Sequence, residues 1–198
     1  MEAMETARRT TIATLLLALA IVAFATATAT LVNKTEWIVK AEYPPVVKVA
    51  GNDVATGLVT VSSNGTRKTS DGVNWTTITV VGFKGDPTTY TSVLKICNKG
   101  TRSVTVTLKY KGVLGGGWDY VKYIKLLYPS SNQEITIQGG TPSGSISFPL
   151  SGGSEEAPSC SGDIGVEVLV TPDAPTNQVL IAIQVDVESQ LSTSQTTP

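Results

Sequence analysis

The feature that most limits the fold of this chain is the alternation of apolar and polar residues between residues 56 and 188. In Ser103–Tyr110 every second residue is apolar, and the same period of two recurs in Ile164–Thr171 and Gln178–Glu188. Successive side chains of a strand point to opposite faces, so each segment predicts a strand with one buried face. No helical period is visible after residue 30.

The alternating segments are separated by clusters of Gly, Asn, Asp and Pro that are typical of turns. The predicted strands are Thr56–Ser62, Trp75–Phe83, Tyr90–Cys97, Ser103–Tyr110, Val121–Tyr128, Glu134–Gln138, Gly144–Leu150, Ile164–Thr171 and Gln178–Glu188. We expect Asn98-Lys99-Gly100-Thr101 to close a hairpin. This pattern predicts an all-β domain over residues 44–188, a β-sandwich of jelly-roll or Greek-key type. Residues 189–198 are expected to form a disordered polar tail.

The first 29 residues are typical of an export signal. Arg8-Arg9 precede an apolar run, Ile12–Ala25, and the small residues Ala27-Thr28-Ala29 follow as a cleavage site. The run is shorter than the ~20 apolar residues that a stable membrane-spanning helix needs. We therefore expect residues 1–29 to be a signal peptide that meets the membrane only during export. The alternative is a cut after Arg9, which would retain the run as the helix of a type IV pilin-like subunit.

Residues 30–43 are predicted to form a further strand, which Pro44-Pro45 ends. One face of this strand would carry Leu31, Asn33, Thr35, Trp37, Val39 and Ala41. Most of these side chains are apolar and one is a tryptophan. The pattern therefore predicts a strand that needs another surface to bury this face.

The chain contains two cysteines, Cys97 and Cys160. An isolated pair in an exported protein is usually oxidised, so we expect a disulfide, with two unpaired thiols as the alternative. Without histidine two cysteines do not complete a tetrahedral metal site, and no metal or other cofactor is expected. Glu155-Glu156 and Asp163 could bind Ca²⁺ with loop carbonyls, but a solvated acidic loop is the preferred interpretation.

Three Asn-x-Ser/Thr triplets are candidate glycosylation sites in an exported chain: Asn33, Asn64 and Asn74. Asn64 and Asn74 fall near predicted turns, where a glycan would be accessible. Asn33 shares the apolar strand face with Trp37, so a glycan there would obstruct burial of that face.

The absence of histidine from all 198 residues removes Ser-His-Asp triads, Cys-His pairs and the commonest general base. We therefore expect no enzyme activity. Charged residues make up 16% of the chain and the net charge is -1, so no basic field is expected to bind nucleic acid. Trp118 and Tyr120 are candidates for an aromatic carbohydrate-binding surface.

Several of these features together resemble the TasA/camelysin group of bacterial biofilm matrix proteins and the similar archaeal bundling-pilus subunits. The features are a signal peptide that runs into a strand, the element Lys84-Gly85-Asp86-Pro87, the turn Cys97-Asn98-Lys99-Gly100-Thr101, and the closing strand Val179–Glu188. The Gly-Asp element and the Asn-x-Gly turn are the most specific part of the resemblance. Camelysin-type proteins have been called metallopeptidases, but the lack of histidine gives no support for that activity here.

The resemblance implies an extracellular, cell-surface filament whose subunits polymerise by donor-strand complementation. The N-terminal strand of one subunit, residues 30–43, would fill a groove in the sheet of the next identical subunit. Such a head-to-tail contact does not close on itself and builds a filament, which could also bundle laterally. Two alternatives remain open: the type IV pilin-like subunit, and a surface-layer-associated carbohydrate-binding module that uses Trp118 and Tyr120.

Overall fold

The structure is a computed structural model of the 198-residue chain, and it describes residues 11–17, 38, 45–62 and 76–192. The chain divides into two compact units, residues 1–42 and 43–198. In the first unit residues 11–17 are helical, which is expected of a signal-peptide core and of a pilin helix alike. Among the described residues, no helix has the length and apolar character needed to cross a bilayer.

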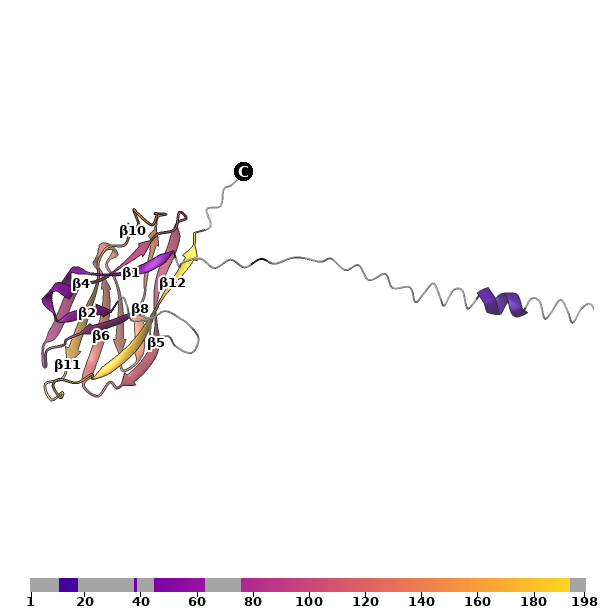
Figure 1. The fold of residues 1–198 in the computed structure, drawn as a ribbon. Helices are drawn as coiled ribbons and strands as arrows, with labels where there is room; N and C mark the ends of the chain where they lie inside the picture. The colour runs from indigo at the N-terminus through magenta and orange to yellow at the C-terminus, as the bar shows by residue number, and fades with distance from the viewer. Residues whose placement is uncertain (1–10, 18–37, 39–44, 63–75, 193–198) are drawn as a thin grey trace, which may run out of the picture. The chain divides into compact units, whose positions relative to one another are not determined.

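The second unit is all-β, as the alternation predicts, and its antiparallel sheets enclose one core (Figure 1). The larger sheet has the spatial order β1 (Val46–Ala50), β4 (Pro87–Asn98), β11 (Ile164–Val170), β6 (Val121–Tyr128), β7 (Gln133–Gln138) and β8 (Thr141–Gly144), with β10 (Ser159–Cys160) also paired to β4. The smaller sheet has the order β12 (Ile181–Leu191), β5 (Val104–Gly116) and β9 (Ile146–Leu150). The remaining elements are a hairpin of β2 (Val59–Ser62) and β3 (Thr77–Val80), and two short 3-10 helices, η1 (Asn52–Thr56) and η2 (Pro129–Ser131).

Both sheets contribute apolar side chains to the core. From the smaller sheet come Val104, Val106 and Leu108 of β5, which occupy alternate positions and are all buried. The Tyr128 ring of β6 stacks on the Phe148 ring of β9, with centroids 4.4 Å apart, so β9 packs over the β6 side of the larger sheet. Since β12 lies on the other side of β5, the smaller sheet ends at β12 on the side toward β4 and β1.

The predicted hairpin at Asn98-Lys99-Gly100-Thr101 is wrong. The strands that flank it, β4 and β5, belong to different sheets, so this turn carries the chain from one layer to the other. Asn98 holds the corner: its Nδ2 donates to the carbonyls of Arg102 at 2.8 Å and Ser151 at 2.9 Å, and its Oδ1 accepts from Gly100 N at 2.9 Å. A buried side chain that satisfies three backbone groups can replace the backbone ladder of a hairpin.

Several strand boundaries also differ from the prediction. The short strands β1, β8 and β10 were not predicted, and β5 continues to Gly116, six residues beyond the predicted strand end at Tyr110. β12 continues to Leu191, three residues beyond the predicted strand end and into the expected tail. There Ser189, Gln190 and Leu191 pair with β5, because backbone groups of a long neighbour can hold polar residues in a strand as well as apolar ones.

Candidate functional site

The outer edge of β12 is the candidate functional site. β12 has 11 residues, and it pairs with β5 on one side only. In the part of the chain that the structure describes, no strand pairs with its other side. An unpaired edge presents a row of N–H and C=O groups that another strand can bind.

The side chains of β12 alternate between the two faces of the sheet along the whole strand. The register moves from Ala182↔Gly115 to Ile183↔Val113, and from Gln184↔Gly112 to Val185↔Tyr110, so β5 carries the extra residue at each bulge. The side chains that share the core-facing side of β12 are Ile181, Ile183, Val185, Val187, Ser189 and Leu191. We call this set, together with the unpaired backbone edge, the β12 edge.

The apolar side chains of the β12 edge are only half-buried. Ile183, Val185 and Val187 pack on the core, but each keeps part of its surface exposed. Across the ladder, Leu108 opposite Val187 is buried, whereas Tyr110 opposite Val185 is half-buried and Val113 opposite Ile183 is exposed. A further strand beside β12 would cover this remaining apolar surface, which favours its addition by roughly 25 cal/mol for each Å² removed from water.

On the larger sheet, the edge strand nearest to this open side is β1. Lys48 of β1 pairs with Ile96 of β4, so its side chain lies on the face of the sheet that carries the buried Ile96. Burial lowers the pKa of the Lys48 amine, and the negative charge of Asp186 on β12 partly offsets that effect. A charge on the inner face of an edge strand discourages unspecific strand pairing. Sequence reasoning missed this residue because β1 itself was not predicted.

The other edges of the two sheets are short or blocked. β8 has four residues and contains Pro142, and β9 has five residues and contains Pro149. A proline has no N–H, so neither of these two residues can donate a backbone hydrogen bond to a partner strand. The amide of Ser147 in β9 already donates to Gln133 Oε1 at 2.7 Å. The β12 edge is therefore the longest edge open to a partner strand in the described domain.

The outer face of β12 carries charges that are already paired. Glu188 lies 2.7 Å from Lys109 and 3.5 Å from Lys111, and Asp186 lies 3.7 Å from Lys111. These carboxylates point away from the core, so they leave the core-facing side of the β12 edge apolar.

Comparison with known proteins does not assign this chain to a family. No family model matches it, and no curated protein is significantly similar. The geometry of the domain is therefore the basis for assigning a function.

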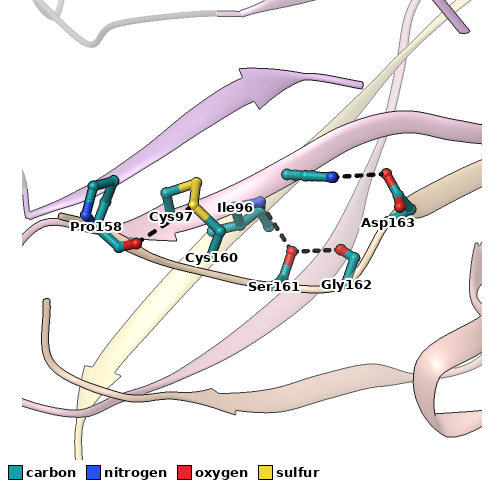
Figure 2. The surroundings of a disulfide bond; sticks show 8 residues. Ile96, Cys97, Pro158, Cys160, Ser161, Gly162 and Asp163 are labelled. Carbon is teal, nitrogen blue, oxygen red and sulfur yellow. Dashed lines mark hydrogen bonds and ion pairs between the residues drawn. A yellow bond between two sulfur atoms is a disulfide. The ribbon is translucent and has the colours of Figure 1, made fainter. Parts of the chain in front are cut away.

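The disulfide between Cys97 and Cys160 is present, as predicted from the isolated pair. Cys160 of β10 lies directly opposite Cys97 of β4, and Figure 2 shows the bond beside Ser161, whose hydroxyl accepts from Ile96 N at 3.0 Å and donates to Gly162 O at 2.7 Å. The bond fastens the loop before β11 to β4. It lies on the larger sheet and contributes no group to the β12 edge.

The acidic residues considered for Ca²⁺ do not converge. Glu155 pairs with Lys99 at 2.6 Å, whereas Asp163 contacts the Ser92 hydroxyl and lies 3.6 Å from Lys95. Within the described residues, no group of three or more metal-ligating side chains is close enough to share an ion.

The aromatic pair considered for carbohydrate binding is divided by burial. Trp118 packs against the core with its Nε1 buried, while Tyr120 is exposed. Trp118 therefore does not offer a flat exposed platform. The remaining predicted site residues, Leu31, Asn33, Thr35, Trp37, Val39, Ala41, Asn64 and Asn74, lie outside the residues that the structure describes.

Proposed function

We propose that this protein is the structural subunit of an extracellular filament, in which residues 30–43 of one copy bind the β12 edge of the next copy. The observation that carries the proposal is the 11-residue unpaired edge of β12 with its half-buried apolar face. A donor strand would satisfy the free backbone groups and cover the apolar side chains in one step.

The length of the donor segment supports this pairing. Residues 31–41 number eleven, as does β12, and at ~3.3 Å per residue both would span about 36 Å. A fourth strand added beside β12 would extend the smaller sheet on its unpaired side.

The two faces of the donor segment also match the two faces of β12. Its odd-numbered residues, which include Leu31, Trp37 and Val39, are mostly apolar and would join the core-facing side. Its even-numbered residues would lie on the same side as Asp186 and Glu188, and with residue 31 beside Leu191 they would place Lys34 opposite Glu188 and Glu36 opposite Asp186. The opposite charges of Lys34 and Glu188 would stabilise the pair by roughly 0.2–1 kcal/mol, and the like charges of Glu36 and Asp186 would oppose it.

The polymer follows from the symmetry of the contact. The donor segment and the β12 edge are different surfaces, so each copy can donate to one neighbour and accept from another. The Cys97–Cys160 disulfide is consistent with an oxidising compartment outside the cytosol.

A matched pair of substitutions tests the proposal. Trp37→Asp places a charge on the donor face and should raise the critical concentration for filament formation about a hundredfold or more, because an aromatic side chain loses its burial. Ile38→Asp changes the opposite face, where Ile38 is exposed, and should leave filaments intact. Deletion of residues 30–42 should abolish filaments and leave soluble protein. Normal filaments from the deletion variant, seen by electron microscopy, would refute the proposal.

The type IV pilin-like alternative makes a different prediction for the mature chain. N-terminal sequencing should give a start near Thr28 or Thr30 if residues 1–29 are removed and residues 30–43 act as donor. A start near Thr10 would retain the apolar run and indicate a helical assembly instead.

A further inference from the structure

Three loops lie together at one end of the sandwich, the lower end in Figure 1: residues 82–86, 117–120 and 171–180. Backbone hydrogen bonds join them in series. Gly85 N donates to Val170 O at 2.8 Å, Thr171 N to Tyr120 O at 2.9 Å, and Gly117 N to Leu180 O at 3.1 Å. We call this surface the basal end.

Each loop of the basal end carries one large apolar side chain that is exposed to solvent. These are Phe83, 54% exposed, Tyr120, 38% exposed, and Val179, 76% exposed. Single exposed apolar residues are ordinary, but one on each of three hydrogen-bonded loops is typical of a surface that is covered by a partner.

The opposite end of the sandwich, which we call the apical end, is where the chain enters β1. There Lys99 N donates to Pro45 O at 2.7 Å, Gly153 N to Gly100 O at 2.8 Å, and Ser192 N to Ser103 O at 3.0 Å. β12 begins at the basal end with Ile181 and finishes at the apical end with Leu191. The donor segment is thus connected to the apical end of its own domain through Pro44-Pro45.

We propose that the basal end binds the apical end of the copy that donates its strand, an inference that rests on the proposed function. Every strand ladder in the described domain is antiparallel. An antiparallel donor would place residue 31 beside Leu191 and residue 41 beside Ile181, at the basal end of the acceptor. The partner for the basal end is therefore a second copy of this chain.

A short linker brings the apical end of the donor close to the basal end of the acceptor. Only residues 42–45 separate residue 41, the last residue beside β12, from β1, and at ~3.3 Å per residue they reach about 13 Å. The apical end of the donor domain is consequently held against the basal end of the acceptor. Phe83, Tyr120 and Val179 are then removed from water by the loops 99–103 and 151–158 of the donor. A parallel donor strand would instead bring two apical ends together.

The direct test places a photoreactive benzoylphenylalanine at position 83 in the full chain. In assembled filaments we expect cross-links from this position to residues 99–103 or 151–158 of another copy, and we expect the Trp37→Asp background to lose them. Cross-links to the basal loops of another copy, or none in filaments that form normally, would overturn the inference.

Two substitutions give an independent readout. Val179→Asp, at a highly exposed position that the fold does not need, should raise the critical concentration about tenfold or more. Thr79→Asp on β3 is the control, because Thr79 is exposed, pairs with the exposed Thr60 and lies outside the basal loops; it should have no effect. Normal assembly of Val179→Asp while Trp37→Asp fails would refute the basal contact alone. Normal assembly of Trp37→Asp would refute the donor-strand function as well.

Discussion

Leu191 of β12 pairs with Val104 of β5, yet Leu191 is 54% exposed and Val104 only 3%. Paired residues share one face of a sheet, so both side chains point toward the core. The difference arises because Val104 has a strand on each side, β9 and β12, whereas nothing in the described part of the domain flanks Leu191. Leu191 therefore lies on the core-facing side of β12 and remains exposed to solvent at the unpaired edge of the strand.

Lys48 provides a test of this open side that depends on pH. Burial lowers the pKa of the amine below its ordinary value of 10.5, so the unfolded chain binds more protons than the folded chain between the folded-state pKa and 10.5. The contribution of Lys48 to the free energy of unfolding therefore increases as pH rises through that window. Lys48→Met removes the buried charge, and we expect it to raise stability at pH 7 by up to about 1 kcal/mol, a gain reduced by solvent screening.

The measurement compares thermal unfolding of Lys48→Met and its parent at pH 7 and near pH 10. Both proteins carry Trp37→Asp, so that assembly does not add to apparent stability. The difference between them should shrink as pH rises. A Lys48→Met variant that is less stable than its parent at pH 7 would contradict this prediction, because the attraction of Lys48 to Asp186 would then exceed the cost of burying the amine.

Asn98 is expected to be the polar residue whose loss costs most. It is fully buried, and Asn98→Ala would leave the carbonyls of Arg102 and Ser151 and the amide of Gly100 without their side-chain partner. At roughly 1 kcal/mol for each unsatisfied group, the free energy of unfolding should fall by about 3 kcal/mol. Chemical denaturation would measure it. Gln138→Ala, at an exposed position, is the control and should change stability by less than about 0.5 kcal/mol.

The disulfide should stabilise the domain through the length of chain that it closes. Cys97 and Cys160 are 63 residues apart in sequence, for which the chain-entropy model gives about 4 kcal/mol. Replacing both with alanine should lower the melting temperature on the order of 10 °C. Thermal unfolding with and without reductant checks the same point in the parent protein. An unchanged melting temperature in both experiments would show that the bond adds nothing to stability.

A cluster on the larger sheet predicts acid sensitivity. Three side chains contact the Glu167 carboxylate. The hydroxyl of Tyr123 donates to it at 2.9 Å, the hydroxyl of Thr89 donates to it at 3.2 Å, and the Lys125 amine lies 3.1 Å from it. The Tyr123 hydrogen bond is the main cause that lowers the pKa of the Glu167 carboxyl below its ordinary 4.5. The ionised Glu167 carboxylate therefore contributes its full stabilisation above pH 4.5, and this contribution disappears as pH falls through the pKa of Glu167 in the folded state.

Glu167→Gln should thus cost about 1 kcal/mol of unfolding free energy at pH 7 and nothing in strong acid, where the parent carboxyl is also neutral. Denaturation curves at the two pH values measure the difference. An equal loss at both would mean that side-chain packing, rather than charge, is responsible.

Much of the strand content could be predicted from the sequence, because alternation is a local property. The core strands β4, β6, β11 and most of β5 and β12 follow the apolar period of two. Short strands such as β1 escaped prediction because five residues after two prolines carry little periodic signal. The C-terminal ends of β5 and β12 were not predicted as strand. Backbone pairing between these two strands holds each end in place, and the side chains at these ends give no alternating signal.

The arrangement of strands could not be predicted in the same way. Asn98-Lys99-Gly100 has the composition of a hairpin turn, but the side-chain hydrogen bonds of Asn98 use it to change sheets. The open edge is likewise invisible in the sequence of β12, since a free edge is a property of its neighbours. Lys48 gained its place beside that edge only through pairing with β4.

Zero-length cross-linking of lysine to carboxylate, in filaments grown from equal amounts of ¹⁴N- and ¹⁵N-labelled chains, tests donor-strand assembly directly. If residues 30–43 of one copy pair with β12 of another, Lys34 should cross-link to Glu188 or Asp186 in peptides that join a light chain to a heavy one. If Lys34 reaches β12 only within its own chain, or never reaches it, donor-strand assembly through the β12 edge is contradicted.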